Sequence, residues 1–449
     1  MTRYRNGLWI LLLAMAMAMA MATAQAQNAP VDAPSARPDP EVAAADDPDA
    51  GENPTTQVPL AEIRRFVSTY TAIRDAYVAP VADARLMHSA LRGLLLELDP
   101  HSVYLDREAA RDFDQDASGS YEGVGLELQQ QPGPALKIIA PVEGGPGERA
   151  GLKSGDLITA IDGKPVGIDD GSAPLRGAVG MPVRLTIERA GREKPFDVTL
   201  VRERIRIASV RARLIAPGFG YVRIASFQSG SAAEFEKALA ALQAQAGGAL
   251  QGLAIDLRSN PGGLLTAAVQ IADDLIDAGT LVSTRGRLKG GDTSFSATRG
   301  DLLGGAPLVV LVDAGSASAS EVLAGALQDS KRARILGSRT FGKGSVQTVL
   351  PLDNGDAVKL TTARYYTPNG RSIQGVGIRP DRVLRAGPDA AAVRDGPSEA
   401  SLPGHLRGEE EGRLPMAGEL AGEVLDGEAP IQAALAELRR MAAPAAKPR

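Results

Sequence analysis

The chain has 449 residues, a formal net charge of −5 and no cysteine. The lack of cysteine excludes disulfides, a thiol nucleophile and thiolate metal ligands. The mild negative charge argues against nucleic acid as the main partner, and the length allows two or three domains with a sizeable core.

Residues 1–26 are predicted to be a secretory signal peptide. Arg3 and Arg5 give a positive start, Leu8–Ala22 is an apolar run, and Ala24–Ala26 is a small-residue cleavage site. The run is short for a membrane span, which needs about 20 apolar residues. We therefore expect export. Because the chain lacks disulfides we expect a bacterial periplasm, with inner-membrane association if the signal is not cleaved.

An N-terminal helical region is predicted over residues 59–118, after a disordered linker rich in Pro, Ala and Asp at 27–58. Apolar side chains recur there at helical spacing. They are Leu60, Ile63, Val67, Tyr70, Ile73 and Tyr77, then Leu86, Leu91, Leu94, Leu95 and Leu98. A short third helix is expected at 107–113. The apolar stripe fits either a homodimer interface or contact with the rest of the chain.

Residues 119–203 alternate short β-rich runs with glycine turns, which predicts a small β-rich domain. The expected strands span 125–128, 136–139, 156–161, 183–188 and 197–201, with a short helix at 148–152.

Strands and helices alternate over residues 204–385, which predicts an α/β domain with a central buried sheet. The expected strands are 221–225, 253–257 and 308–312, and the expected helices are 232–246, 263–278 and 319–330. The turn Asp353-Asn354-Gly355-Asp356 predicts a hairpin. Residues 386–449 are expected to be a C-terminal tail with one short helix at 431–441.

The strand Leu308–Val312 is followed within a few residues by the start of a helix at Ser318. A side chain at such a junction lies at the carboxyl edge of a sheet, where ligands bind in open α/β folds. It also lies beside the free N–H groups of a helix N-terminus, which suit a developing oxyanion. Ser318 is therefore a candidate nucleophile. A structural alternative is open, because Ser318-Ala319-Ser320-Glu321 also fits a capping box.

Lys343 stands between two glycines in the segment Phe341-Gly342-Lys343-Gly344. An exposed lysine is protonated at neutral pH and cannot act as a base, whereas burial lowers its pKa. Lys343 is thus either a buried base or an ordinary residue of a surface turn. Gln347, four residues further on, could orient its amine.

Two glycine segments could present backbone N–H groups. Asn260-Pro261-Gly262-Gly263 follows a predicted strand and fits either an oxyanion hole or a tight turn. Gly123-Val124-Gly125-Leu126 runs into a strand and could bind a chain-terminal carboxylate and a peptide strand; the alternative is a plain glycine turn.

Histidine is rare in this chain, which contains only His88, His101 and His405. None follows a buried strand, so a histidine base is not favoured, although a Ser-His-Asp triad can assemble from distant positions. Paired histidine spacing for a metal site is absent from the sequence. We expect no metal and no cofactor.

Five motifs occur along the chain in this order: Leu98-Asp99-Pro100-His101-Ser102, Asp256-Leu257-Arg258 with Asn260-Pro261-Gly262-Gly263, Gly315 through Glu321, Thr340 through Gln347, and Thr361-Thr362-Ala363-Arg364-Tyr365-Tyr366. Together they resemble the carboxyl-terminal processing peptidases, also called tail-specific proteases. The resemblance covers about residues 60–385.

The resemblance implies a crotonase-like, spiral ββα serine peptidase core at 204–385, with a PDZ domain inserted at 119–203. It implies Ser318 as the nucleophile, Lys343 as the general base and Gln347 as the residue that supports the lysine.

The same resemblance implies further site residues. The backbone amides of Gly262 and Ala319 would form the oxyanion hole, and Asp329 would be a supporting aspartate. The peptide tail would bind along the PDZ segment Gly123, Val124, Gly125 and Leu126.

The sequence as a whole therefore predicts an exported serine endopeptidase that recognises apolar C-terminal tails of substrate proteins through a PDZ domain. A homodimer and an activating adaptor protein are further expected partners. The rival interpretation is a non-catalytic periplasmic PDZ adaptor in which Ser318 only caps a helix.

Overall fold

The structure is a computed structural model that describes residues 58–130, 133, 135–166, 173–287, 292–385, 398–409 and 422–443. The predicted signal at 1–26 and nearly all of the predicted linker lie outside these residues. The chain divides into two compact units, residues 1–77 and 78–449. Within the described residues, no helix is both long and apolar enough to span a membrane.

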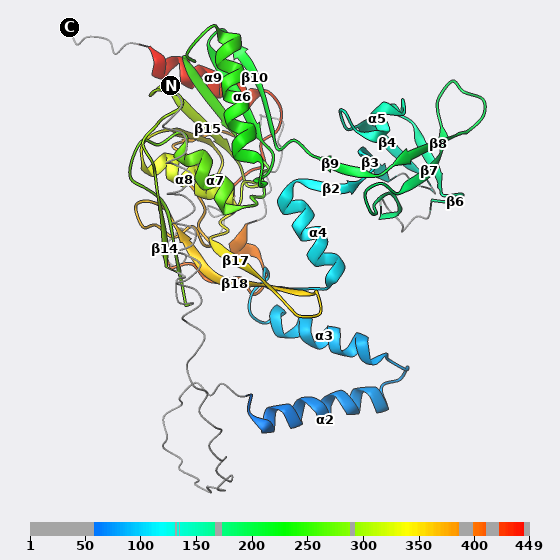
Figure 1. Cartoon of the computed structure of the whole chain (residues 1–449). Coiled ribbons are helices and arrows are strands. Elements are labelled where there is room, and N and C mark those ends of the chain that lie inside the picture. The colour runs from blue at the N-terminus through cyan, green and yellow to red at the C-terminus, as the bar shows by residue number, and fades with distance from the viewer. Residues whose placement is uncertain are drawn as a thin grey trace, which may run out of the picture. The chain divides into compact units, whose positions relative to one another are not determined.

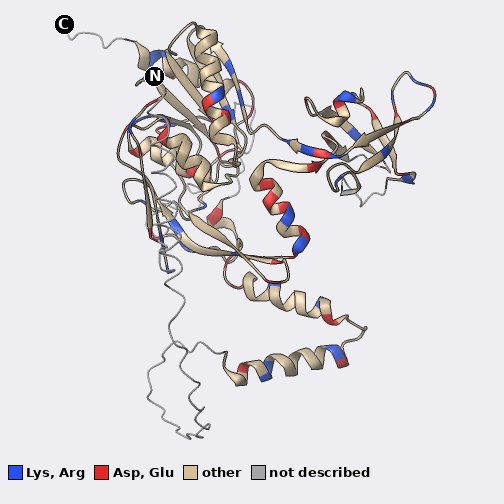
Figure 2. Ribbon diagram, viewed as in Figure 1, with Lys and Arg blue, Asp and Glu red and all other residues tan. Residues whose placement is uncertain are grey.

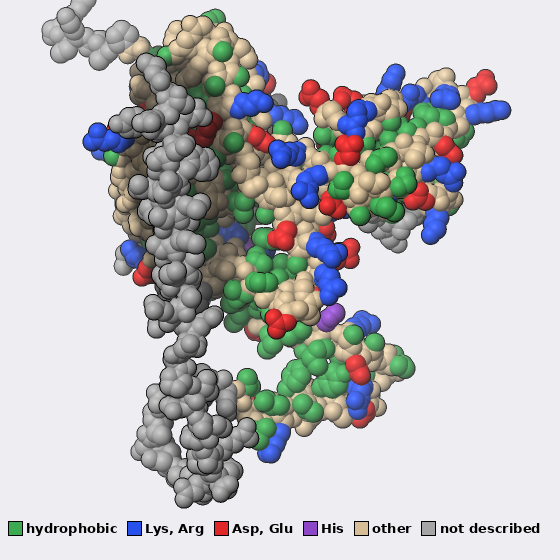
Figure 3. All heavy atoms as spheres, in the orientation of Figure 1, with side chains coloured by type: hydrophobic (Ala, Val, Ile, Leu, Met, Phe, Trp, Pro, Cys, Tyr) green, Lys and Arg blue, Asp and Glu red, His purple; other side chains and the backbone are tan. Residues whose placement is uncertain are grey.

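The described part of the first unit is helix α2 (Leu60–Ala76), which confirms the first predicted helix. None of its residues is buried. Its hydrophobic side chains lie at the surface (Figure 3), and they include Leu60, Ile63, Phe66, Val67 and Ile73.

The second unit begins with α3 (Asp83–Leu96), β1 (Val103–Leu105) and α4 (Arg107–Ser118). The side chain of Asp106 caps α4 by accepting a hydrogen bond from the Ala109 amide. Both acidic and basic residues occur along α4 (Figure 2). Because β1 pairs with β18 of the α/β domain, this segment is joined to the domain by a strand.

The β-rich domain contains all five predicted strands. They are β3 (Leu126–Gln130), β4 (Leu136–Pro141), β5 (Leu157–Ile161), β7 (Pro182–Glu188) and β8 (Phe196–Val201), which form one antiparallel sheet with β6 (Lys164–Pro165). Two short helical pieces accompany it, α5 (Pro146–Arg149) and η1 (Ala173–Leu175). The strands β2 (Ser120–Gly123) and β9 (Glu203–Arg206) pair with each other at its two ends.

The α/β domain is built on a sheet of order β10-β11-β12-β15-β16-β19. Its strands are β10 (Val210–Ala216), β11 (Phe219–Ile224), β12 (Gly252–Asp256), β15 (Leu308–Val312), β16 (Arg334–Gly337) and β19 (Arg382–Val383). All pairs are parallel except β10 with β11. Every residue of β12 and β15 is buried, as expected for parallel strands covered on both faces.

Alternate residues of β15 face two different hydrophobic clusters. Leu308, Val310 and Val312 belong to the cluster formed with α6 (Ser231–Ala246), α7 (Leu265–Asp273) and α8 (Ala319–Asp329). Val309 and Leu311 belong to the cluster formed with α9 (Ala429–Ala442). The two-residue period of a strand thus explains why this sheet needs helices on both sides (Figure 1).

The position of α9 differs from the sequence-based expectation of a C-terminal tail. The helix lies on the second face of the sheet and buries Ile431, Ala434, Leu435 and Leu438 against it. Those side chains recur at helical spacing, so the apolar face that the sequence displays is part of the core.

A second sheet has the order β1-β18-β13-β14, with β17 paired to β18. Its strands are β13 (Thr280–Gly286), β14 (Thr293–Ser296), β17 (Ser345–Pro351) and β18 (Ala357–Tyr366). The hairpin β17–β18 confirms the predicted turn at 353–356. The pairing shifts register between Val346 and Gln347, so Gln347 lies opposite Thr361.

Candidate active site

Ser318 lies at the N-terminus of α8, in the loop that leaves β15. Its backbone has φ 55° and ψ −115°, a conformation that side-chain-bearing residues rarely adopt. Such strain persists only where surrounding contacts impose it, and it concentrates at functional sites. Only 8% of the residue is exposed.

The contacts that hold Ser318 in this conformation converge on Glu321, which is fully buried. One carboxylate oxygen accepts hydrogen bonds from the backbone amides of Ser318 (2.8 Å) and Lys343 (2.9 Å). The other accepts from the Gly342 amide (2.7 Å) and the Thr340 hydroxyl (2.5 Å). Burial raises the pKa of Glu321 to about 7, and these four donors act in the opposite direction. A single carboxylate therefore ties the serine loop to the lysine loop.

The capping box that the sequence offers as the alternative role of Ser318 is present at the start of α8, and its Glu321 carboxylate accepts from the Ser318 amide. The capping role and a role as nucleophile therefore fall on the same residue. Tyr365 lies beside it: burial raises the pKa of Tyr365 to about 12, and a hydrogen bond with Ser318 acts in the opposite direction.

Lys343 is partly buried, and its amine donates a hydrogen bond to Oε1 of Gln347 at 2.7 Å. Burial lowers the pKa of Lys343 to about 8, and repulsion from Lys359 acts in the same direction. The carboxylates of Glu399, Glu321 and Asp99 oppose this shift. A substantial fraction of this amine is therefore neutral near pH 8.

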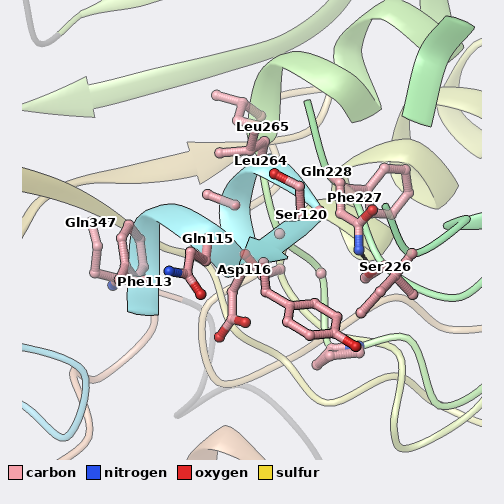
Figure 4. Close-up of a pocket in the computed structure, with 18 of the residues that line it drawn as sticks. Phe113, Gln115, Asp116, Ser120, Ser226, Phe227, Gln228, Leu264, Leu265 and Gln347 are labelled. Carbon is pink, nitrogen blue, oxygen red and sulfur yellow. Dashed lines mark hydrogen bonds between the residues drawn. The ribbon is translucent and has the colours of Figure 1, made fainter. Parts of the chain in front are cut away.

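A single pocket brings Ser318, Lys343 and Gln347 together, and Gly262, Val124 and Leu126 also line it. Figure 4 shows side chains of α4 on its wall, including Phe113 and Gln115. Hydrophobic residues dominate another part of the lining: Phe227, Leu264, Leu265 and Val346. No direct hydrogen bond joins the Ser318 hydroxyl to the Lys343 amine in this structure, and the amine is held by Gln347 instead.

The two predicted oxyanion-hole residues lie side by side. A Cβ atom on Gly262 would come within 2.9 Å of the Ser318 Cβ and 3.0 Å of the Ala319 nitrogen. A side chain at residue 262 would therefore block the space in front of the Ala319 amide. No partner for that amide occurs among the described residues. The Gly262 amide differs, because it donates to Oδ1 of Asn260 at 2.9 Å.

Asp329 lies at the opposite end of α8 from Ser318. Its carboxylate forms an ion pair with Arg371 and accepts a hydrogen bond from the Asn369 amide at 3.0 Å. The helix of 11 residues separates the two ends by about 16 Å at 1.5 Å per residue. The structure does not bring Asp329 to the pocket.

The predicted tail-binding segment lies between β2 and β3, with Gly125 in a left-handed conformation (φ 67°). Its carbonyls are already used inside the domain: Val124 O accepts from the Gly147 amide at 3.0 Å, and Gly125 O from the Val142 amide at 3.0 Å. These bonds fix the loop against α5.

None of the three histidines lies in the pocket lining. Nε2 of His101 is 2.8 Å from a carboxylate oxygen of the fully buried Glu399, and Nδ1 of His405 is 2.9 Å from the Leu402 carbonyl. The His88 ring lies near Tyr104. In the portion of the chain that the structure describes, no group of three or more candidate ligands could hold a metal ion.

Known proteins share this combination of domains. Residues 218–384 match peptidase family S41, residues 137–189 match the PDZ domain, and residues 15–109 match the N-terminal domain of the activating protease CtpB. The carboxy-terminal-processing protease of Bartonella bacilliformis is 40% identical over 356 residues, which cover 78% of this chain and 82% of that protein. The chain belongs to the carboxy-terminal-processing protease family.

Two further proteins are similar to this chain. A probable CtpA-like serine protease of Staphylococcus aureus is 37% identical over 342 residues, which cover 74% of this chain and 66% of that protein. The solved structure of a photosystem II D1 C-terminal processing protease is 35% identical and covers 72% of this chain and 93% of that chain, with a TM-score of 0.43. The predicted family, the peptidase fold with a PDZ domain and the assignment as a serine peptidase are confirmed.

Three polar residues near the lysine of this protease were not predicted from the sequence: Glu321, Asp99 and Thr361. Each belongs to a motif that was recognised, but its partner is remote in the sequence. Glu321 was considered only as half of a capping box, although it is 22 residues from Lys343, whose amide it binds. A buried acidic residue in the first turn of an otherwise apolar helix was the available signal.

Proposed function

We propose that this protease cleaves peptide bonds with Ser318 as the nucleophile and Lys343 as the general base, after its PDZ domain binds the C-terminal tail of a substrate protein. The observation that carries the proposal is the partly buried amine of Lys343, with its pKa lowered to about 8, in the pocket that Ser318 also lines. A base must be unprotonated near working pH, and burial achieves this for a lysine.

In the proposed reaction, the Ser318 hydroxyl attacks the scissile carbonyl carbon while its proton passes to the neutral Lys343 amine. The Ala319 amide donates to the resulting oxyanion. The Gly262 amide joins it once its bond to Asn260 is shared or exchanged. The lysine then gives its proton to the leaving amine, and an acyl-enzyme ester on Ser318 remains. Lys343 activates a water molecule, which hydrolyses this ester and restores the free serine.

Gln347 supports the lysine in this proposal. Its Oε1 accepts a hydrogen bond from one N–H of the amine. The lone pair of the neutral amine therefore remains available to accept the Ser318 proton. Catalytic hydrogen bonds are often long in the absence of substrate. We propose that the hydroxyl and the amine come into hydrogen-bonding contact when a substrate chain occupies the pocket.

Tail recognition is assigned to the PDZ segment 123–126. A PDZ domain binds an extended chain end along a strand edge, and Val124 and Leu126 offer apolar contacts in the same pocket as Ser318. Substrates with apolar tails fit this lining.

We also propose that the protein is exported to the periplasm by the signal at 1–26, and that an adaptor protein activates it.

The test compares the wild-type protein with Ser318→Ala and Lys343→Arg on a substrate protein that ends in an apolar tail. Both variants should lose at least about 100-fold in kcat/KM. Arginine keeps the charge but stays protonated, so it cannot accept the serine proton. Lys237→Arg on the exposed face of α6 is the matched control and should retain full activity.

Two outcomes would overturn the assignment. Full cleavage by Lys343→Arg would exclude Lys343 as the general base. Equal cleavage by wild type and Ser318→Ala would exclude Ser318 as the nucleophile. The non-catalytic adaptor is not favoured, because the chain belongs to a peptidase family.

A further inference from the structure

A chain of hydrogen bonds leads from the Lys343 amine away from the pocket. Oε1 of Gln347 accepts from the amine at 2.7 Å. Nε2 of Gln347 donates to the Thr361 hydroxyl at 3.2 Å, and that hydroxyl donates to Oδ1 of Asp99 at 3.1 Å. We call these four residues the lysine relay.

The direction of every bond in the lysine relay is fixed by its last member. An ionised carboxylate only accepts hydrogen bonds, so the single hydroxyl hydrogen of Thr361 must point to Asp99. The hydroxyl is then an acceptor toward Gln347, which must turn its NH₂ group to Thr361 and its carbonyl oxygen to the lysine. Asp99 thereby favours the Gln347 orientation in which the amine meets Oε1, and the same Nε2 also donates to the Ser345 hydroxyl at 2.9 Å.

Asp99 is well suited to stay ionised in this position. It is only 3% exposed. Burial acts to raise its pKa, but hydrogen bonds from the Ser102 hydroxyl, the His101 amide and Thr361 outweigh burial, so the pKa of Asp99 lies below its ordinary value. The Ser102 hydroxyl donates to the second carboxylate oxygen at 2.7 Å and lies 3.4 Å from the Thr361 hydroxyl.

A bulge in the β17–β18 hairpin brings the relay together. The register shifts after Val346 opposite Ala363, so Gln347 faces Thr361 rather than Thr362. Directly opposed residues of an antiparallel pair project to the same side, and bulges re-aim side chains in this way. The hydroxyl oxygen of Thr362 instead lies at hydrogen-bonding distance, 2.7 Å, from the hydroxyl oxygen of Thr348.

From this geometry we propose that Asp99 and Thr361 are positioning residues that orient the Gln347 amide so that the Lys343 lone pair stays available to Ser318. The inference rests on the proposed function of Ser318 and Lys343. It gives the segment before β1, about 240 residues from the lysine in the sequence, a role in the chemistry.

The first experiment measures kcat, KM and their pH dependence for Thr361→Val, Thr361→Ser and Thr362→Val in the full-length protein. Thr361→Val keeps the shape but breaks the relay, so kcat should fall by about 10- to 100-fold with little change in KM. Thr361→Ser keeps the hydroxyl and should restore most of the activity. Thr362→Val is the same substitution one residue along the strand and should leave kcat within about twofold of wild type.

The second experiment compares Asp99→Ala with Asp99→Asn. Oδ1 of Asp99, which accepts from Thr361, also accepts from the backbone amides of His101 (2.8 Å) and Ser102 (2.9 Å), so an asparagine should keep its oxygen at this position and preserve the direction of the relay. Asp99→Ala removes the acceptor, which allows the Thr361 hydrogen to point to Gln347 and the Gln347 NH₂ group to face the lysine lone pair, so the plateau value of kcat should fall. Asp99 acts to raise the pKa of Lys343, so Asp99→Asn should keep the plateau and move the acid limb to lower pH. An unchanged plateau in Asp99→Ala would overturn the positioning role of Asp99. The double variant Asp99→Ala with Thr361→Val should lose little more than either single variant.

The outcomes separate this inference from the proposed function. If Ser318→Ala is inactive but Thr361→Val matches wild type, the relay has no role and the Ser318–Lys343 assignment stands. If Thr361→Ser is as impaired as Thr361→Val, or if Thr362→Val is equally impaired, the loss comes from disturbed strands and the inference is wrong. Activity in Ser318→Ala would instead overturn the proposed function itself.

Discussion

At the scale of single residues, the surroundings of Lys343 shift its pKa away from the ordinary value of a lysine. Burial and the neighbouring Lys359 ammonium lower its pKa to about 8, whereas three carboxylates oppose the shift. Lys359 itself has a lowered pKa, mainly through burial, and its amine lies 5.6 Å from the centre of the Phe113 ring. Nearby charges of both signs therefore set the pKa of the proposed base.

The first prediction concerns the pH dependence of cleavage. Because Lys343 must be neutral to act as a base, kcat/KM should rise as the pH increases through about 8. Lys359→Met removes a charge that disfavours protonation of Lys343, so the pKa of Lys343 should rise and the acid limb should move to higher pH. Lys237→Met, on an exposed position of α6, should leave the limb in place. A limb that stays unchanged in Lys359→Met would contradict this electrostatic account.

Residue by residue, the sequence motifs were a good guide to which side chains gather in the pocket. Ser318, Lys343 and Gln347 were all named from short motifs, and one pocket contains them. Asp99 and Thr361 could not be connected to them in advance, because the β17–β18 bulge that aligns Gln347 with Thr361 is a property of strand pairing. The hydrogen bond from the Gly262 amide to the Asn260 side chain was likewise not predictable from the glycine turn in the sequence.

At the scale of elements, the junction between β15 and α8 shows why this architecture suits the site. The strand is fully buried, so its end fixes the loop that follows, and the helix supplies an unpaired amide at Ala319. Hydrophobic periodicity predicted both elements closely. It also predicted α7 as 263–278, whereas the helix spans Leu265–Asp273. The two glycines before it adopt positive φ angles (102° and 134°), which a helix cannot accommodate.

The second prediction concerns the element that the sequence analysis left outside the core. Leu438 on α9 is completely buried against the sheet, so Leu438→Ala should lower the free energy of unfolding by about 2–5 kcal/mol. Gln432→Ala on the exposed side of the same helix is the control and should change it by less than about 0.5 kcal/mol. Urea denaturation followed by circular dichroism measures both. A cost for Leu438→Ala as small as that of the control would mean that α9 does not belong to the core.

At the scale of the whole molecule, one chain combines a peptidase domain with a PDZ domain, and both contribute residues to one pocket. The PDZ strand β3 lies close to α5, where a Cβ atom on Gly147 would come within 2.5 Å of Leu126 Cδ2 and 3.2 Å of the Gly125 carbonyl. The shape of the predicted tail-binding segment therefore depends on a glycine that belongs to a different element.

The third prediction tests that dependence. Gly147→Ala should push Leu126 out of place and weaken the binding of an apolar tail peptide by about tenfold, or about 1.4 kcal/mol. Fluorescence anisotropy of a labelled peptide with the whole protein measures this, in a Ser318→Ala background that prevents cleavage. Lys194→Ala, on an exposed position of the same domain, should bind as before. Unchanged binding in Gly147→Ala would place the tail elsewhere.

The sequence by itself determined the α/β class of the peptidase domain, the five main strands of the β-rich domain and the motif residues of the pocket. It could do so because periodicity, turn chemistry and short motifs are local. The tertiary structure alone decided that Glu321 joins the serine and lysine loops, that α9 completes the core, and that Asp99 reaches Gln347 through Thr361. Each of these depends on contacts between segments far apart in the chain, whose pairing and register no local pattern specifies.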